Sequence, residues 1–187
     1  YIIDNNIFDL SAPYSKLYNR NIVINNNIKF PLGIHMGEDG IFITRYLNAV
    51  DSITTITDSD YYQRKVENSL SSNYYDFSSE WICYKTWKHE MCKFINKYGQ
   101  IFEDPLRIVW KTRIGGTFNR CLQSVYRSKQ KISIRKQVDC LNSIPKKDLC
   151  EFNLYYNPSL IRRKILKWLI SLRMFYIYCF LGCFDKK

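Results

Sequence analysis

Glycine and proline are scarce in this sequence, with seven and five among its 187 residues. This scarcity argues against collagen-like and low-complexity chains, which are rich in those two residues. The chain is instead 46% apolar and 24% charged, a balance that can bury a core and that excludes disorder as the main state. A mass of 22.4 kDa suffices for one domain and part of a second.

Motifs for common cofactors and export signals are also lacking. The sequence contains neither a G-x-x-x-x-G-K-[ST] loop nor a G-x-G-x-x-G turn, which argues against P-loop and dinucleotide sites. Residues 1–10 do not have the pattern of a signal peptide. They open on an apolar run without an initiator Met, as expected of a segment of a longer protein or of a processed terminus.

The cysteines form no C-x-x-C pair and have no zinc-ligand spacing to either histidine. They are Cys83, Cys92, Cys121, Cys140, Cys150, Cys179 and Cys183. Their odd number and scattered spacing predict reduced thiols in a cytosolic compartment. His35 and His89 have no Cys or Ser partner arranged for nucleophilic catalysis, so we expect both in loops or on the surface.

Charge is distributed unevenly along the chain. Residues 1–80 carry six basic and ten acidic side chains, a net charge of −4, whereas residues 81–187 carry 22 and seven, a net charge of +15. The two parts therefore serve different purposes. No helix-turn-helix, zinc-finger or RNP-like motif accompanies the basic part, so we expect no specific nucleic acid as partner. A membrane surface or an acidic nucleotide product explains the charge equally well.

Apolar spacing predicts helices over most of the chain. Apolar side chains recur at three- and four-residue steps over residues 38–50 and again from Trp81 to Tyr98, which predicts a second helix of roughly 20 to 25 residues. Further helices are expected over residues 106–128, with an interruption at Gly115 and Gly116, over 132–144, stopped by Pro145, and over 159–182.

Two short β-branched or aromatic runs predict strands at residues 53–56 and 61–66, on either side of Asp58-Ser59-Asp60. The N-terminal part of the chain therefore has a mixed α/β pattern, and the remainder is helical. Asp58 and Asp60 could be taken for a metal motif, but Asp and Ser are ordinary turn residues between strands, which is the interpretation we favour.

An acidic pair, Glu38 and Asp39, stands between Gly37 and Gly40 at the predicted start of a helix. Free backbone N–H groups and the helix dipole keep a carboxylate ionised and oriented at such a position. A fixed carboxylate within reach of a hydroxyl can act as a general base. The alternative is that the two acids only favour the helix end electrostatically.

Five ordered motifs surround this pair. They are Ala12-Pro13-Tyr14-Ser15-Lys16-Leu17-Tyr18, Ile28-Lys29-Phe30-Pro31, Gly37-Glu38-Asp39-Gly40-Ile41-Phe42, Tyr61-Tyr62-x-Arg64 and Asn68-Ser69-Leu70-Ser71. In this order and spacing, over about residues 8–72, the chain resembles the C-terminal half of the catalytic domain of bacterial family 2 glycosyltransferases. The resemblance implies a partial GT-A-type mixed sheet (α/β overall, α+β in this part), followed by a mainly helical region.

The resemblance also implies an activity: inverting transfer of a sugar from a nucleotide-diphospho sugar to a hydroxyl of a glycan or lipid-linked acceptor, as in cell-envelope polysaccharide biosynthesis. Asp39 would be the base and Glu38 would support the acceptor site. The residues implied near the substrates are Lys16, Tyr18, Tyr62, Arg64 and Ser69. Arg64 is suited to pair with phosphate oxygens, although an exposed Arg on an edge strand is an equal alternative. Lys16 and Tyr18 could equally flank a strand end with Leu17 buried.

The nucleotide-binding half of that family, with its metal-binding Asp-x-Asp, would lie before residue 1. A divalent metal, Mg or Mn, is therefore expected for the complete enzyme, with ligands mostly outside this chain, and the 187 residues alone are expected to be inactive. The expected division is an acceptor-side part over residues 1–72, a helical region over 73–157 and a basic amphipathic helix over 158–187. The competing class is a non-enzymatic helical binding or membrane-adaptor protein.

The C-terminal segment is both basic and apolar. On a helical projection its basic side carries Arg162, Arg163, Lys164, Lys167 and Ser171, and its apolar side carries Ile161, Ile165, Trp168, Leu169, Leu172 and Tyr176. Such a helix suits an anionic membrane surface, and residues 169–184 are too few to span a bilayer. We therefore expect a cytoplasmic protein with peripheral contact on the inner face of the cell membrane. The alternative is that the apolar side packs on the preceding helices.

Overall fold

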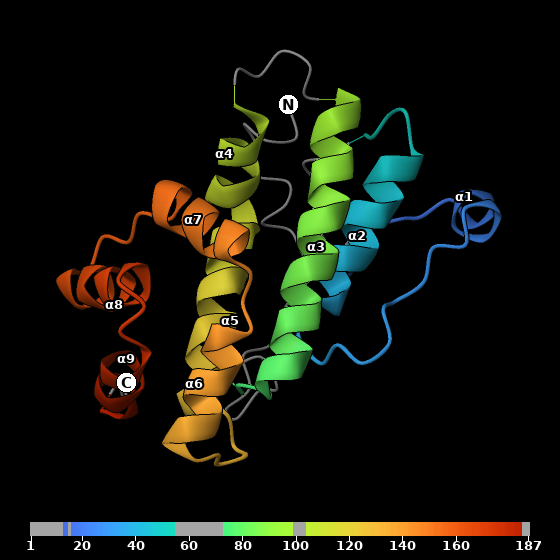
Figure 1. Cartoon of the computed structure of the whole chain (residues 1–187). Helices are drawn as coiled ribbons and strands as arrows, with labels where there is room; N and C mark the ends of the chain where they lie inside the picture. Colours follow the sequence, from blue (N-terminus) through green and yellow to red (C-terminus); the bar gives the residue numbers. More distant parts are fainter. Residues whose placement is uncertain (1–12, 15, 55–72, 99–103, 185–187) are drawn as a thin grey trace.

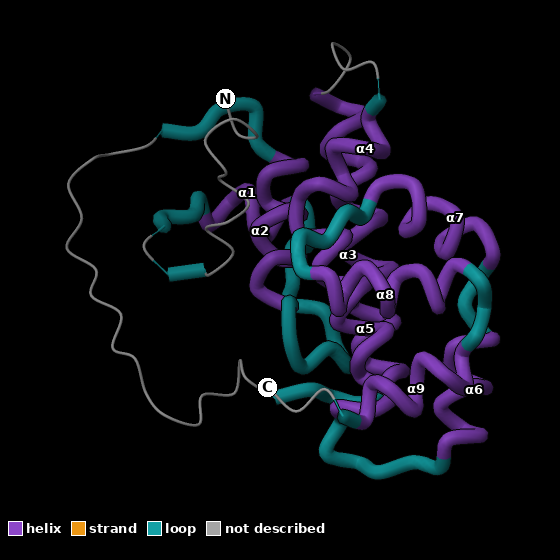
Figure 2. The backbone as a smooth tube through the Cα atoms, turned by 90° about the vertical axis from the view of Figure 1, so that its left-hand side faces the viewer, coloured by secondary structure: helices purple, strands orange, loops and turns teal. Residues whose placement is uncertain are grey.

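The computed structural model describes residues 13–14, 16–54, 73–98 and 104–184. Within these ranges the regular secondary structure is helical (Figures 1 and 2). The α-helices are α1 (Arg20–Asn25), α2 (Glu38–Ala49), α3 (Phe77–Tyr98), α4 (Pro105–Val109), α5 (Gly115–Arg127), α6 (Ile134–Asn142), α7 (Lys146–Tyr155), α8 (Ile161–Ser171) and α9 (Phe175–Cys183). One π-helical turn, Trp110–Ile114, joins α4 to α5.

The expected mixed sheet is wrong for this part of the chain, because the described residues form helices and no strand (Figure 2). Ile53 and Thr54, which begin the first predicted strand, have no regular secondary structure. The other residues of both predicted strands, and Asp58 and Asp60, lie outside the described residues. The described core consists of helices packed on helices, since each long amphipathic segment can bury its apolar side on another.

The helix α3 is the centre of the packing. Contacts between α2 and α3 advance together along both helices, from Gly37 beside Cys83 to Val50 beside Tyr98, so the two helices run parallel. The helix α5 runs antiparallel to α3, since Arg120 pairs with Glu80 at 2.9 Å near the start of α3 and the preceding Trp110 packs further along it, beside Tyr84. The predicted helices over 38–50 and 81–98 are thus confirmed as α2 and α3.

An aromatic cluster fills the space between α3, α5 and α7. Phe118 contacts Tyr84 and Trp110 edge-on, with ring centroids 4.6 and 5.5 Å apart, and Phe152 lies 5.0 Å from Phe118. All four side chains are buried. Large aromatic side chains each bury a large apolar area, so this cluster supplies much of the core between these helices.

Gly115 and Gly116 do not interrupt the helical run that was expected to break there. The chain instead changes to a π-helical turn, in which the Gly115 N–H bonds to the Trp110 carbonyl five residues earlier. A Cβ on Gly115 would lie 2.7 Å from that carbonyl oxygen. The absence of a side chain at Gly115 therefore permits the wider turn, and the helix continues without a break.

The single helix expected over residues 159–182 is two helices, α8 and α9. Arg173 between them has a φ of +55°, a left-handed conformation that ends a right-handed helix. The Met174 N–H bonds back to the Leu169 carbonyl at 2.9 Å, which closes the end of α8. The helices α1 and α7 had no counterpart in the expectations from the sequence. In the described part of the chain, no helix has both the length and the apolar character to cross a membrane.

A largely buried ionic group joins α3 to α7. The Lys88 ammonium donates to Asp148 at 2.8 Å and to Glu151, while Tyr84 also donates to Asp148 and the Trp110 indole donates to Glu151 at 3.1 Å. Burial opposes the charge on Lys88, but its hydrogen bonds to the two carboxylates outweigh burial and raise its pKa. One cation and two carboxylates leave a net charge of −1, and the hydrogen bonds from Tyr84 and Trp110 stabilise the carboxylates further. Each member of the group has a partner within it, so we assign the group to stability.

Candidate functional site

The acidic pair lies at the N-terminus of α2, as predicted. Gly37 has a φ of +90° and provides no side chain to cap the helix, so Glu38 and Asp39 are the groups that complement the positive end of the helix dipole. Both side chains are partly buried. The left-handed backbone at Gly37 favours glycine, which has no Cβ to clash there, and it turns the preceding loop into the helix.

The indole of Trp87, on α3, packs against the turn that carries the pair. A Cβ on Gly40 would lie 2.5 Å from the Trp87 ring, and a Cβ on Gly37 would lie 2.8 Å from the Cys83 sulfur. The two glycines therefore allow α3 to approach the backbone on either side of Glu38 and Asp39. Trp87 was expected only as an apolar helix position, because the sequence does not indicate which residues face it.

This packing predicts that alanine substitutions at Gly40 and at Gly116 have opposite effects on stability. We expect Gly40→Ala to lower the free energy of unfolding by about 1 to 3 kcal/mol, because its methyl group would overlap the Trp87 ring. We expect Gly116→Ala to raise it by about 0.5 to 1 kcal/mol, because that position is open and helical. Urea unfolding followed by circular dichroism measures both. A Gly40→Ala protein as stable as the wild type would contradict the packing.

Tyr18 is brought to α2 by the segment that precedes α1. Its ring packs edge-on against Phe42 and Tyr46 of α2, at 5.4 and 4.9 Å between centroids, and its hydroxyl donates to the Pro13 carbonyl at 3.3 Å. Burial, and then the nearby charge of Asp39, raises the pKa of Tyr18 to about 12. Tyr18 is therefore a neutral hydrogen-bond donor near Asp39 at ordinary pH.

Lys16 and Leu17 differ in their surroundings. The Lys16 ammonium donates to the Tyr14 carbonyl at 3.5 Å, and burial lowers its pKa, so it is partly shielded from water in the segment before Tyr18. Leu17 is fully exposed and its segment is not a strand. The alternative of a strand end with a buried Leu17 is thus wrong.

The two carboxylates of the pair have different surroundings. Burial, together with the negative charge of Glu38, raises the pKa of Asp39, since a like charge close by disfavours ionisation. The Oε2 atom of Glu38 is buried and accepts no hydrogen bond from the described residues. The arrangement thus gives Asp39 a raised proton affinity in the neighbourhood of Tyr18.

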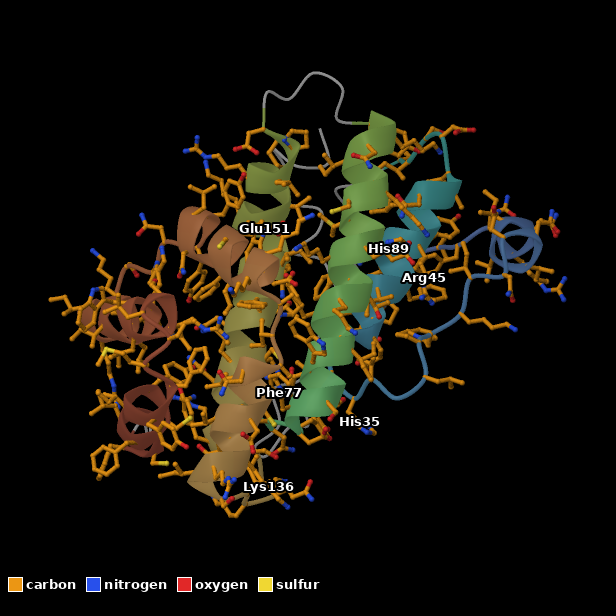
Figure 3. The ribbon with its side chains drawn as sticks, viewed as in Figure 1. His35, Arg45, Phe77, His89, Lys136 and Glu151 are labelled. Carbon is orange, nitrogen blue, oxygen red and sulfur yellow. The ribbon has the colours of Figure 1, made fainter. Side chains whose placement is uncertain are left out.

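The described residues do not form a binding site for the divalent metal that the resemblance implies. Among them no group of three or more His, Cys, Asp or Glu side chains could hold a metal ion, and Mg²⁺ requires near-octahedral oxygen coordination. His35 is exposed and stacks on Tyr75 at 5.0 Å, while His89 is exposed on α3 (Figure 3). Both histidines therefore lie on the surface, as expected.

Of the residues expected at the site, Tyr18, Glu38 and Asp39 are brought together at α2, and Lys16 lies in the same segment as Tyr18. Tyr62, Arg64 and Ser69 lie outside the described residues. All seven cysteines are free thiols, in agreement with the expectation from their spacing. Comparison of the chain with protein-family models, curated proteins and solved structures finds no match.

Proposed function

We propose that the N-terminus of α2 is the acceptor side of an inverting glycosyltransferase, which transfers a sugar from a nucleotide-diphospho sugar to a hydroxyl of a glycan or lipid-linked acceptor. The observation that carries this proposal is the position of Asp39. It is a partly buried first-turn carboxylate with a raised pKa, and its charge acts on the Tyr18 hydroxyl. The proximity of Tyr18 and Asp39, which belong to two motifs that are separate in the sequence, supports the proposal.

The chemistry assigned to Asp39 is proton transfer. One carboxylate oxygen accepts the proton of the acceptor hydroxyl while the hydroxyl oxygen attacks the anomeric carbon. The bond from that carbon to the nucleoside diphosphate breaks in the same displacement, which inverts the anomeric configuration. The raised pKa of Asp39 increases its affinity for the proton, which then leaves to solvent.

The neighbours of Asp39 would position the acceptor. Tyr18 remains neutral because its pKa is about 12, so its hydroxyl can donate to or accept from a sugar hydroxyl. Glu38 keeps a buried carboxylate oxygen without a partner among the described residues. Because that oxygen is shielded from solvent, the support that Glu38 gives to the acceptor site would come from its negative charge beside Asp39. Lys16 adds a positive charge in the segment that carries Tyr18.

The proposal is tested with the protein purified at its natural length from its natural host. It would be incubated with UDP-glucose, UDP-N-acetylglucosamine, GDP-mannose or dTDP-rhamnose and an extract of host glycans and lipids, with Mg²⁺ and Mn²⁺ present. We expect release of nucleoside diphosphate that depends on both the protein and the extract. Absence of such release with every donor would contradict the proposal and favour a non-enzymatic binding protein.

A further inference from the structure

The helix α8 has two apolar faces, of which only one is covered within the described part of the chain. Leu166, Leu169 and Ile170 are buried against the rest of the molecule. The second face consists of side chains at steps of four, three and four residues that are 47% to 77% exposed: Ile161, Ile165, Trp168 and Leu172. A surface helix ordinarily needs only one apolar stripe, toward its own core. The second stripe is therefore available to an external partner.

The neighbouring helix α9 also exposes apolar side chains. It buries Phe175, Tyr178 and Cys179 and leaves Tyr176 and Phe180, one helical turn apart, in contact with solvent. The two helices pack on each other at the edge of the molecule opposite α1 and α2 (Figure 1). We define the α8–α9 face by its exposed apolar residues Ile161, Ile165, Trp168, Leu172, Tyr176 and Phe180.

The charged side chains that α8, α9 and their flanking residues contribute have one sign. Residues 158–184 contain five basic side chains and no acidic one. They are Arg162, Arg163, Lys164, Lys167 and Arg173. The partner that complements this surface is therefore apolar in its interior and anionic at its boundary. Trp168 and Tyr176 are side chains of the type that is enriched where an apolar phase meets water.

We propose that the α8–α9 face docks on the surface of an anionic lipid bilayer, with its apolar side chains in the boundary between headgroups and acyl chains and its cations among the lipid headgroups. An apolar helical face flanked by Lys and Arg binds in this manner, and anionic lipids strengthen the attraction. The proposal does not depend on sugar transfer, since none of its residues belongs to the site at α2.

Flotation of the 187-residue chain with vesicles tests this proposal. The vesicles would be phosphatidylcholine alone, or two parts of phosphatidylcholine to one part of phosphatidylglycerol. We expect at least a tenfold larger bound fraction with the anionic vesicles, and a decrease as salt is raised. We also expect quenching of tryptophan fluorescence by brominated lipid, because Trp168 belongs to the exposed α8–α9 face. No flotation with either vesicle would overturn the proposal.

Matched variants distinguish binding through the α8–α9 face from nonspecific adsorption to vesicles. Trp168→Glu is expected to reduce binding to anionic vesicles at least tenfold, and Lys164→Glu is expected to reduce it with little effect on phosphatidylcholine. Leu32→Glu, at an exposed apolar position in the loop before α2, is expected to bind as the wild type does. Circular dichroism verifies the fold of each variant. Equal loss in Leu32→Glu, or a dimer in sedimentation that Trp168→Glu abolishes without any vesicle binding, would overturn the proposal.

Discussion

Asp39→Asn is expected to lower turnover by about 10²- to 10⁴-fold in the natural-length protein, the usual contribution of a general base. Asparagine fills the same volume but cannot accept the proton of the acceptor hydroxyl. Initial rates of donor-dependent transfer measure the effect. The matched control is Asp51→Asn, just beyond the opposite end of α2, where the side chain is almost fully exposed and pairs with Lys97 at 3.5 Å. We expect that variant to transfer at the wild-type rate.

The stability of the Asp39→Asn protein distinguishes a base from a helix-end charge. The folded-state pKa of Asp39 is raised, so its contribution to stability is largest at low pH and is lost as pH rises through that pKa. At neutral pH, removal of the charge is therefore expected not to lower the melting temperature. A lower melting temperature with unchanged turnover would assign the acid pair to helix stability and contradict its role as base.

The raised pKa of Asp39 also predicts how transfer depends on pH. The ionised form of Asp39 is the active one, so kcat/KM is expected to rise with pH through the raised pKa of Asp39. Glu38→Gln removes the negative neighbour that contributes to that shift and is expected to move the rise toward lower pH. A wild-type profile without this rise would show that Asp39 does not govern transfer.

Lys88→Met is expected to have the largest effect on stability, with a loss of about 3 to 5 kcal/mol in the free energy of unfolding. The change removes the cation shared by Asp148 and Glu151 and leaves two carboxylates largely buried without their counter-charge (Figure 3 labels Glu151). Such a loss is a large part of the total stability of a typical folded domain. Urea unfolding at neutral pH measures it.

Two further variants test the cause of that loss. Lys93→Met removes an exposed lysine that pairs with Glu90 at 3.5 Å on the same helix, and it is expected to cost at most about 1 kcal/mol. Combining Lys88→Met with Asp148→Asn and Glu151→Gln removes the unpaired charges and is expected to recover most of the stability. A Lys88→Met protein within about 1 kcal/mol of the wild type would contradict this account.

The position of the candidate site was predictable to a large extent. The acid pair at the start of a helix follows from local signals, namely the two glycines, the adjacent carboxylates and the apolar spacing after them, and α2 begins at Glu38 as expected. What those signals could not provide is the role of Trp87, which lies on another helix and contacts Gly40 only in the fold. The raised pKa of Asp39 has the same origin, since burial is its main cause.

In the C-terminal region, the sequence predicted less of the structure. Its basic and apolar sides are evident in the sequence, but the break at Arg173 is not, because no glycine or proline marks the left-handed residue. Whether the apolar side packs inward or faces solvent was also open. The packing answers that question, because Leu166, Leu169 and Ile170 face the core and leave the second apolar stripe of α8 outside.

Local patterns were enough to locate α2, α3 and α6, the acidic start of α2 and the basic character of the second part, because these depend on residues within one or two helical turns of each other. The absence of strands from the described residues, the ionic group around Lys88 and the two faces of α8 emerged only from the folded arrangement. These features depend on which distant segments become neighbours. A periodic pattern shows that a face is apolar, but the available partners in space decide what covers it.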